Sequence, residues 1–382
     1  MTAHVESYLA GLTATSAVPG IQYVVVSSAG VLFEHASGFA DIRNRVPVDA
    51  ATTMMAYSMS KTITAAAVLQ LFETGRVGLD EPVERYLGSL QPYGPVVTIR
   101  QLLSHTSGIP NPIPLRWVHA TDQHQTFDED GALAAALINH PRLSFAPGSR
   151  YAYSNIGYWL LGKVIERVTG ERFTAHVVGE VLRPLGIGPG DLGYVVVDPA
   201  HHATGYLEKY SLMNVVKGLL LDRRLIGEYS GKWLAIRSHY LNGPAFGGLV
   251  GTSKGFGAFL QDQLRDQSVL FSADTRRQFY AQQHTSQGKP IPMTLGWHIG
   301  DRDARRFFYK EGGGGGFHCM MRLYPADGFG TVVMTNATGF DVAKLLDVTD
   351  PAFFTKGPRY NKDRPSVDLP HAFEREVPRR SP

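Results

Sequence analysis

Cysteine and charge are both scarce in this sequence. The only cysteine among 382 residues is Cys319, which excludes internal disulfides and a cysteine-rich metal site. Charged residues make up 19% of the chain, the formal net charge is +3, and no face is evidently rich in Lys or Arg. A nucleic-acid partner is therefore not expected. The 43% of hydrophobic residues are ordinary for a globular protein and suffice for a large core.

Long apolar runs are absent as well. No run approaches the roughly 18 apolar residues of a transmembrane helix, so no membrane association is expected. Residues 1–9 contain no basic segment followed by an apolar core, which argues against a signal peptide. Together with the single cysteine, these absences predict a reduced, cytoplasmic protein. His201, His202 and His318 have no companion ligands at metal spacing, so we expect no metal and no cofactor.

The sequence does contain a serine and a lysine at the start of a predicted helix. Residues 62–73 are rich in alanine and free of Pro and Gly, and Thr74-Gly75 ends them, as is typical of a helix. Positions three apart share a helix face, so Lys61 can reach Ser58. A lysine whose pKa is lowered, here by the positive end of the helix dipole, can take the serine proton and create a nucleophile. Alternatively, Ser58 only caps the helix and Lys61 is solvated.

A second candidate group lies directly before a predicted helix over residues 156–168. Tyr153 and Asn155 are two positions apart in an extended or turn segment, so both can point into one cleft. A phenol whose pKa is lowered by neighbouring ammonium groups can relay protons, and an Asn amide can orient a lysine and a substrate carbonyl. Alternatively, Asn155 caps the helix and Tyr153 belongs to the core.

Five consecutive glycines form the third candidate group. They span residues 312–316 and follow Lys310 and Glu311 at the end of a predicted strand. A strand that ends in glycines lets a ligand approach its backbone, and an N–H group there can pair with that of Ser58 as an oxyanion hole. A phosphate loop is not indicated, because the pattern Gly-x-x-x-x-Gly-Lys-Ser/Thr is absent. A flexible hairpin turn is the alternative.

Predicted strands gather at the two ends of the chain. They are expected at residues 21–26, 31–35, 295–299, 306–310, 317–324 and 329–335. Short connections between consecutive strands indicate an antiparallel sheet. Roughly residues 80–290 predict helices and loops, most clearly helices at 156–168 and 256–264. We therefore expect an α+β protein whose antiparallel sheet is formed from both chain ends, flanked by helices, and carries a large, mainly helical insertion.

The expected domain boundaries follow from this division. Residues 1–80 and 290–348 form the sheet part, in which a last helix over 340–347 covers the sheet. Residues 81–289 form the helical part. Residues 349–382 form a C-terminal tail rich in Pro, Arg and Lys that is poorly ordered or wraps around the protein. Sheet and helical parts together make one unit.

In chain order, the three candidate groups resemble the motifs of the serine β-lactamase and penicillin-binding-protein superfamily. These motifs are Ser58-x-x-Lys61, Tyr153-x-Asn155 and Lys310-x-Gly312. Four further segments resemble signatures of its class C-like branch, which holds class C β-lactamases, family VIII carboxylesterases, D-amino-acid-specific peptidases and acyltransferases. They are residues 102–110, 145–148, 247–249 and 296–297. The resemblance extends from about residue 5 to about residue 345 and leaves only the tail uncovered.

This resemblance implies a β-lactamase-like fold and an acyl-enzyme mechanism. By it, Ser58 attacks a carbonyl, and Lys61 and Tyr153 manage the serine proton. Asn155 positions Lys61 and the substrate, and Lys310 sets the electrostatic field around Tyr153. Water or another acceptor then takes the acyl group, and no metal or organic cofactor is required.

The resemblance also implies an oxyanion hole and one departure from the family pattern. The N–H groups of Ser58 and Gly313, beside Gly312, would hold the oxyanion. Glu311 departs from the Lys-Thr-Gly of true β-lactamases, in which the Thr helps to bind the antibiotic carboxylate. If Glu311 faces the cleft rather than solvent, it repels carboxylate substrates and favours neutral or amine-bearing ones. Many family VIII esterases carry Trp-x-Gly or His-x-Gly here, so Lys310 also departs from the commonest esterase pattern and keeps a peptidase activity open.

Other features are assigned no catalytic role. Residues 251–255 match the Gly-x-Ser-x-Gly nucleophile elbow of α/β-hydrolases, but no strong parallel strand precedes them. Thr252 or Ser253 is better interpreted as a helix cap. His105 is interpreted as structural, and Cys319 as a small buried residue.

The sequence therefore predicts a serine hydrolase that acts on esters of small or medium carboxylic acids, that is, a carboxylesterase. The alternatives are a β-lactamase or D-amino-acid peptidase or amidase, and an acyltransferase using the same acyl-enzyme. An idle scaffold is disfavoured, because no member of the three motifs is missing. The expected partner is a small ester or amide, and the oligomeric state is open. Residues 111–117 and 212–221 are candidates for lining an acyl pocket, although core packing explains the second equally well.

Overall fold

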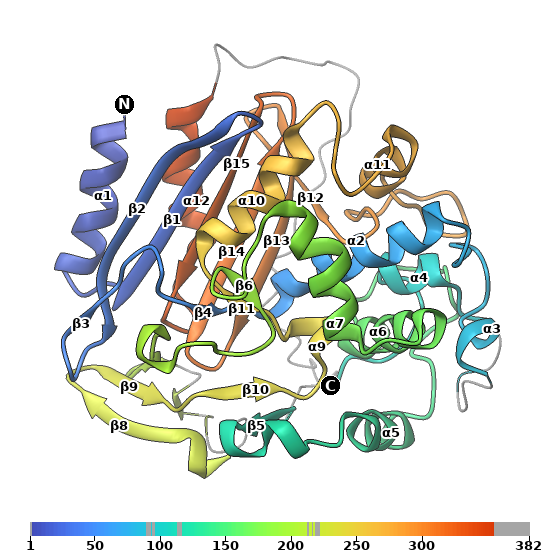
Figure 1. Cartoon of the computed structure of the whole chain (residues 1–382), viewed down its shortest axis with the longest axis horizontal. Coiled ribbons are helices and arrows are strands. Elements are labelled where there is room, and N and C mark those ends of the chain that lie inside the picture. The colour runs from blue at the N-terminus through green and yellow to red at the C-terminus, as the bar shows by residue number, and fades with distance from the viewer. Residues whose placement is uncertain are drawn as a thin grey trace, which may run out of the picture.

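A seven-stranded antiparallel sheet joins the two ends of the chain, in the strand order β12-β13-β14-β15-β1-β2-β3 (Figure 1). The computed structural model describes residues 2–88, 93, 96–112, 117–211, 214–215, 217 and 222–354. The strands of the sheet are β1 (Gly20–Ser27), β2 (Gly30–Asp41), β3 (Val46–Pro47), β12 (His298–Arg302), β13 (Arg305–Gly314), β14 (Phe317–Tyr324) and β15 (Phe329–Thr335). The N-terminal β1 pairs with the C-terminal β15, with Val24 opposite Val332. The predicted α+β fold, with one antiparallel sheet from both chain ends, is confirmed.

Helices cover both faces of this sheet. Two of them, α1 (Thr2–Ala14) and α12 (Val342–Thr349), share a core cluster with one face. On the other face, α10 (Ser253–Leu264) packs on β1 and β15, and α2 (Ser60–Glu73) shares its core cluster (Figure 1). Because both faces are covered, every residue of β15 is buried.

A mainly helical part adjoins this second face (Figure 1). Its further helices are α3 (Glu84–Leu87), α4 (Ile99–Leu103), α5 (Glu129–Asn139), α6 (Asn155–Thr169), α7 (Phe173–Val177), α9 (Pro244–Gly247) and α11 (Ala273–Tyr280). The side chain of Ser154 caps α6 by accepting from Gly157 N at 3.1 Å, and Gly170 ends it with a φ of 79°. The helix predicted over 156–168 is thereby confirmed.

Short strands occur in the region that predicts only helices and loops, and one further short strand lies at residues 54–55. They form three small sheets, made of β4 (Met54–Met55), β11 (Val250–Gly251) and β6 (Leu192–Gly193), of β7 (Gly205–Glu208), β9 (Trp233–Ile236) and β8 (Ile226–Ser230), and of β5 (Val118–Ala120) and β10 (His239–Leu241). Each strand has two to five residues, which is too short to show a period-two pattern in sequence. The domain boundaries near residues 80 and 290 remain predictions.

The first C-terminal strand begins later than predicted. A strand was expected at 295–299, whereas β12 starts at His298. Gly296 has a φ of 112°, which interrupts an extended strand, and a Cβ added there would lie 2.6 Å from the Cβ of Ala65 in α2. Residues 295–297 therefore pack against α2 and do not extend the sheet.

Parts of three predicted segments lie outside the described residues. They are 113–116 of the loop, most of 212–221, and the tail after residue 354. The described start of the tail forms the short helical turn η7 (Asp350–Phe353), whose Phe353 ring lies 6.1 Å from that of Phe329. None of the helices in the described part of the chain combines the length and apolar character that crossing a membrane requires.

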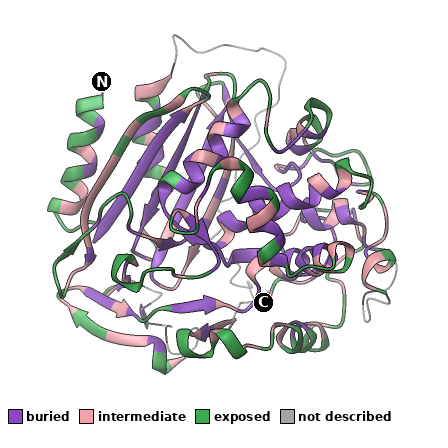
Figure 2. Cartoon of the chain, in the orientation of Figure 1, coloured by how far each residue is buried: buried purple, intermediate pink, exposed green. Residues whose placement is uncertain are grey.

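The helix α2 runs through the interior of the molecule. Eleven of its 14 residues are buried, and it is coloured as buried along most of its length in Figure 2. A helix enclosed on all sides carries few polar side chains, because each buried polar group costs free energy unless it is hydrogen-bonded. Lys61 is one of these buried groups, with no exposed surface. The groups around Lys61 therefore decide whether its amine is charged.

Candidate active site

Ser58 lies on a tight turn that leads into α2. This turn is the 3-10 helix η1 (Tyr57–Met59), and Tyr57 has a φ of 44°, which is unusual for an aromatic residue. No side chain caps η1 or α2, and Met59 occupies the cap position of α2. The interpretation of Ser58 as a helix cap is therefore wrong. A strained residue directly before Ser58 is typical of a functional turn.

Two side chains converge on the Ser58 hydroxyl. Lys61 Nζ lies 3.0 Å from Ser58 Oγ, and Tyr153 OH lies 2.7 Å from the same oxygen. Lys61 comes from α2, while Tyr153 comes from the segment before α6. Lys61 Nζ also donates to Asn155 Oδ1 at 2.7 Å and to Phe246 O at 2.6 Å. The structure thus brings together four of the predicted site residues around one hydroxyl.

Burial sets the protonation of Lys61. Complete enclosure lowers the pKa of its amine well below the usual range, and the nearby Lys310 lowers this pKa further. The expected direction of the shift is therefore confirmed, but its main cause is burial. A neutral amine at this position keeps a lone pair that can accept a proton.

The expectation that ammonium groups lower the pKa of Tyr153 is wrong. Burial raises the pKa of this phenol well above its usual range, and the hydrogen bond to Ser58 only partly opposes that effect. Burial likewise lowers the pKa of both neighbouring lysines, Lys61 and Lys310. Tyr153 is a neutral phenol that donates to Ser58.

Lys310 is a second buried lysine beside the Tyr153 ring. Its Nζ is 5.2 Å from the centre of the Tyr153 ring and 5.9 Å from that of Tyr158. Within the described part of the chain this buried Nζ has no hydrogen-bond partner. Burial lowers the pKa of Lys310 to about 7, although Glu311 opposes the shift. Near neutral pH, the charge of Lys310 therefore responds to small changes in its surroundings.

Asn155 is the first residue of α6 and is free to bind Lys61. The cap of this helix is Ser154, so the alternative that Asn155 caps α6 is wrong. Its backbone N–H donates to Asn111 Oδ1 at 3.0 Å, which fixes the residue, and its side-chain oxygen points at Lys61. Tyr153 and Asn155 therefore point into one site, as their spacing predicts.

The glycines of β13 bring its backbone against the Ser58 turn. A Cβ added to Gly312 would lie 2.1 Å from Ala56 O and 3.0 Å from Ser58 N, so only glycine allows this approach. The strand β12 pairs with β13 only as far as Tyr309. From Lys310 to Gly314, the described chain leaves this edge of β13 without a strand partner. A free edge beside Ser58 offers backbone groups, including Gly313, to a bound carbonyl.

Glu311 points to the opposite face of β13 from Lys310 and Gly312. Successive residues of a strand alternate between faces, and Glu311 Oε1 lies 2.6 Å from His318 Nε2. The other ring nitrogen of His318 lies 2.5 Å from Phe340 O. The Glu311 side chain is only 19% exposed, so it neither faces Ser58 nor extends freely into solvent. His318 is therefore a hydrogen-bond partner of Glu311, a role that the sequence does not indicate.

Two further residues contribute to the site, and only the first is missing from the sequence prediction. Phe246 supplies a backbone carbonyl to Lys61, and no sequence pattern reveals a carbonyl, although the neighbouring segment 247–249 belongs to the resemblance. The ring of His105 packs at a tilt against that of Tyr153 with 4.3 Å between ring centres, and its Nδ1 accepts from Ser154 N at 3.1 Å. This contact agrees with the structural interpretation of His105, because the ring holds the segment that carries Tyr153.

The residues set aside in sequence occupy structural positions. Thr252 caps α10 by accepting from Gly255 N at 3.1 Å, and the strand before it has only two residues and is antiparallel to its neighbours. The interpretation of this segment as a helix cap is confirmed. Cys319 is 1% exposed in β14, and burial raises the pKa of its thiol well above the usual range. This thiol is therefore a small buried group, as expected.

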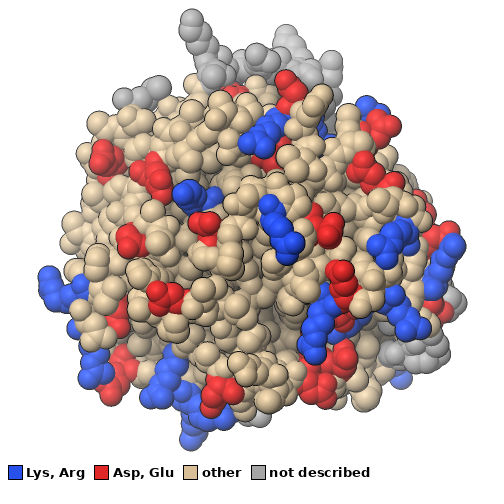
Figure 3. Space-filling view, in the orientation of Figure 1, with Lys and Arg blue, Asp and Glu red and all other residues tan. Residues whose placement is uncertain are grey.

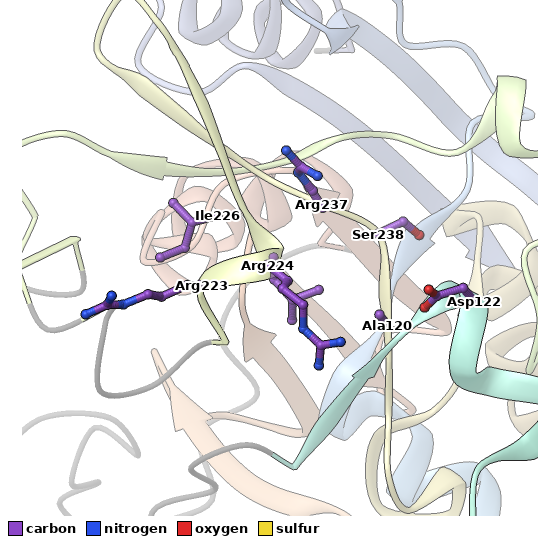
Figure 4. Close-up of a pocket in the computed structure, with 8 residues that line it drawn as sticks. Ala120, Asp122, Arg223, Arg224, Ile226, Arg237 and Ser238 are labelled. Carbon is purple, nitrogen blue, oxygen red and sulfur yellow. The ribbon is translucent and has the colours of Figure 1, made fainter.

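A surface pocket of about 370 Å³ lies next to the β5–β10 ribbon (Figure 4). It is lined by Ala120, Asp122, Arg223, Arg224, Leu225, Ile226, Arg237 and Ser238. None of the predicted site residues lines it. Its three arginines point in different directions in Figure 4, and Arg224 is paired with Asp222 at 2.9 Å. The arginines thus do not converge on one ligand.

Charge is spread thinly over the face shown in Figure 3. The face shown in Figure 3 carries Lys and Arg interspersed with Asp and Glu, without a large patch of one sign. Among the described residues, no three His, Cys, Asp or Glu side chains are grouped so that they could hold a metal ion.

Comparison with known sequences places this geometry in a family. The family model for beta-lactamase matches residues 5–350. Esterase EstB from Burkholderia gladioli is 35% identical over 209 residues, which cover 49% of this chain and 50% of that protein. Penicillin-binding protein 4* from Bacillus subtilis is 26% identical over 300 residues, which cover 77% and 63%. Protein flp from Staphylococcus aureus matches over 50% of this chain and 38% of its own length. The matched regions thus span less than two thirds of each of these relatives.

Solved structures share the fold at low sequence identity. The D-amino acid amidase from Ochrobactrum anthropi SV3, complexed with L-phenylalanine amide, superposes with a TM-score of 0.76 at 20% identity, over 92% of this chain and 96% of that one. The octameric penicillin-binding protein homologue from Pyrococcus abyssi gives 0.70 at 21% identity, over 92% and 77%. The matched model covers nearly all described residues, and the fold agrees. The chain belongs to the beta-lactamase family of serine hydrolases.

Proposed function

We propose that this protein is a carboxylesterase that forms an acyl-enzyme through Ser58 and acts on small or medium acyl esters. The observation that carries the proposal is the pair of contacts at Ser58 Oγ, 3.0 Å to Lys61 Nζ and 2.7 Å to Tyr153 OH. A serine hydroxyl between a neutral amine and a neutral phenol has a proton acceptor on one side and a proton donor on the other.

Lys61 is the proposed base. A neutral amine has two N–H bonds, and these are matched by Asn155 Oδ1 and Phe246 O, so the lone pair is left for the Ser58 proton. As Ser58 Oγ bonds to the ester carbonyl carbon, its proton moves to Lys61. The negative charge collects on the carbonyl oxygen, which the N–H groups of Ser58 and Gly313 stabilise.

Tyr153 is the proposed acid for the leaving group. When the carbon–oxygen bond of the ester breaks, the phenol gives its proton to the departing alkoxide, and the Lys61 ammonium restores it. Water then attacks the acyl-enzyme with the same groups in reverse order, which releases the carboxylic acid and returns Ser58 to its starting state. Lys310 lies beside the Tyr153 ring, and its charge sets the electrostatic field in which Tyr153 gives up and regains its proton.

Two observations favour an ester over a β-lactam as substrate. The relative named as an esterase is 35% identical over half of this chain. Around Ser58, burial lowers the pKa of Lys61 and Lys310, so neither amine carries a firm positive charge that would bind the carboxylate of a β-lactam.

Amide hydrolysis on a D-amino acid derivative is the second candidate. It is favoured by Lys310, which departs from the commonest esterase pattern. Acyl transfer would use the same acyl-enzyme with another acceptor.

The test is a comparison of the wild type and Ser58→Ala on p-nitrophenyl acetate, p-nitrophenyl butyrate, nitrocefin and D-alanine p-nitroanilide. We expect ester turnover to dominate and to fall at least about 1,000-fold in Ser58→Ala, because the nucleophile is lost. The matched control is Ser253→Ala, which removes a hydroxyl at the start of α10 and leaves turnover intact. Ester turnover that survives in Ser58→Ala would overturn the mechanism. Nitrocefin turnover far above ester turnover would overturn the substrate class.

A further inference from the structure

The side chain of Tyr57 links three elements that meet beside Ser58. Its ring lies against Gly314 of β13, where an added Cβ would be 2.3 Å from the ring. Its hydroxyl donates to Gly315 O at 2.8 Å and lies 3.0 Å from Nε2 of His239, the first residue of β10. Tyr57 is 5% exposed, so these contacts are protected from solvent.

The two N–H donors of the proposed oxyanion hole belong to different elements, so a contact between these elements must fix the distance between the donors. One N–H belongs to Ser58 in η1 and the other to Gly313 in β13, and Tyr57 and Gly315 are 258 positions apart in the chain. On one side of Gly313, the backbone of Gly312 rests directly against Ala56 O. On the other side, Gly315 is held by the hydroxyl of Tyr57. Gly313 is thus fixed between two contacts to the segment that carries Ser58.

His239 determines where the Tyr57 hydroxyl lies. Its Nδ1 is 3.0 Å from Arg237 O, and because a carbonyl only accepts, Nδ1 carries the hydrogen. Burial lowers the pKa of His239, which leaves Nε2 as an acceptor toward Tyr57. Burial also raises the pKa of Tyr57 well above its usual range, so the hydroxyl keeps its proton. One hydroxyl proton therefore serves two acceptors, Gly315 O and His239 Nε2, which hold it between them.

We propose that Tyr57 is a positioning residue that sets the separation of the Ser58 and Gly313 N–H groups, with His239 as its support. This inference rests on the proposed acyl-enzyme chemistry of Ser58. It adds a requirement for the hydroxyl of Tyr57, which touches no reacting atom. An oxyanion hole stabilises the transition state only if both donors point at the developing charge, and small displacements are costly.

The test is Tyr57→Phe, which keeps the ring against Gly314 and removes only the hydroxyl. With p-nitrophenyl butyrate we expect kcat to fall about 10- to 100-fold while KM changes less than about 2-fold. The reason is that the oxyanion hole stabilises the transition state and contributes little to the binding of the ground-state ester. Phenylboronic acid, which forms a tetrahedral adduct with an active serine, is expected to bind more weakly by a similar factor. His239→Gln, whose amide can still contact the hydroxyl, is expected to retain more activity than Tyr57→Phe.

The matched control is Tyr86→Phe, which removes another hydroxyl that holds a backbone group, here Gly78 N at 2.7 Å. A loss of thermal stability alone would be shared by both variants, whereas the loss of kcat and of boronate affinity is expected only in Tyr57→Phe. If Ser58→Ala abolishes ester turnover but Tyr57→Phe changes neither quantity, this inference is wrong and the proposed function stands. If turnover does not depend on Ser58, the proposed function itself fails.

Discussion

At the scale of single residues, burial controls the protons of the site more than neighbouring charge does. It lowers the pKa of Lys61 and Lys310 and raises that of Tyr153, so each group favours its neutral form. A site made of neutral amines and a neutral phenol can move a proton without separating charge over a long distance. It also lacks a firm cation for anionic substrates.

Glu311 lies on the face of β13 that points away from Ser58, so its removal tests whether its charge reaches a bound substrate through the strand. We expect Glu311→Gln to raise kcat/KM for p-nitrophenyl hydrogen glutarate relative to p-nitrophenyl butyrate by only about 2- to 3-fold, since a carboxylate repels a carboxylate but the strand separates the two. The measurement is made at pH 8, where Lys310, with a pKa of about 7, is mostly neutral. His318 limits the effect by pairing with Glu311.

The matched control is Glu228→Gln, which removes an exposed carboxylate from the edge of another sheet. Its side chain is 76% exposed and pairs with Arg43 on the surface. The ratio of the two substrates should stay at the wild-type value. An unchanged ratio in Glu311→Gln would mean that Glu311 lies outside the reach of the bound substrate.

Residue types and spacing predict which residues meet, but not the energies of their protons. The spacing of Ser58 and Lys61, and of Tyr153 and Asn155, predicts the contacts that the structure contains. The pKa of Tyr153 is opposite to expectation, because its value depends on enclosure by residues that are distant in sequence. The pairing of Glu311 with His318 is equally invisible, since it arises from the register of β13 and β14.

At the scale of elements, the approach of β13 to the Ser58 turn is the contact least tolerant of change. We expect Gly312→Ala to lower kcat for p-nitrophenyl butyrate at least about 100-fold, because the new methyl group would collide with Ala56 O and displace the turn. The free energy of unfolding is expected to fall by about 1–3 kcal/mol, as is typical of an overpacked interior. Both quantities are measured, the second by urea unfolding.

The matched control is Gly11→Ala in α1, where an added Cβ meets no atom within 4 Å. There alanine favours the helix, so the free energy of unfolding should rise by about 0.5–1 kcal/mol while kcat stays unchanged. Full activity in Gly312→Ala would show that the turn can move away without harm, contrary to the role given to this contact.

Long elements are predicted from sequence more reliably than short ones. The pattern over 156–168 predicts α6, and long runs of β-branched and aromatic residues bounded by turns at both chain ends predict the main sheet. The ribbon of β5 and β10, which holds His239, has only three residues in each strand. Its pairing is fixed by tertiary contacts, so the link from His239 to Tyr57 appears only in the folded structure.

At the scale of the whole molecule, the buried lysines make stability depend on pH. In the unfolded chain a lysine has a pKa of about 10.4. In the fold the pKa of Lys310 is about 7 and that of Lys61 is well below its usual range. Between these values the unfolded chain binds more protons, so the free energy of unfolding rises with pH. We expect each lysine to contribute a slope of roughly 1.4 kcal/mol per pH unit between pH 7.5 and 9.5, measured by urea unfolding. Above about pH 8.5 the thiol of Cys319, whose pKa is raised in the fold, opposes this slope, because only the unfolded chain loses that proton.

Lys310→Met removes one of the two lysines and is expected to reduce this slope by roughly 1.4 kcal/mol per pH unit. Lys344→Met, which removes an exposed lysine from α12, is the control and should leave the slope unchanged. A wild-type stability that is flat over this range would contradict the protonation states on which the proposed mechanism depends.

The pairing of the first strand, β1, with the last strand, β15, also determines how early during synthesis the main sheet can fold. During synthesis the ribosome completes β1 and β2 long before β15, which pairs with β1 along its length. At about 5–20 residues per second, the roughly 300 intervening residues take about 15–60 s. For that time the apolar edge of β1 has no partner, and such edges invite aggregation. Pairing of distant segments is also slow to nucleate. The growing chain therefore carries Ser58 well before β13 can arrive beside it, and it depends on rapid completion or on chaperones during that interval.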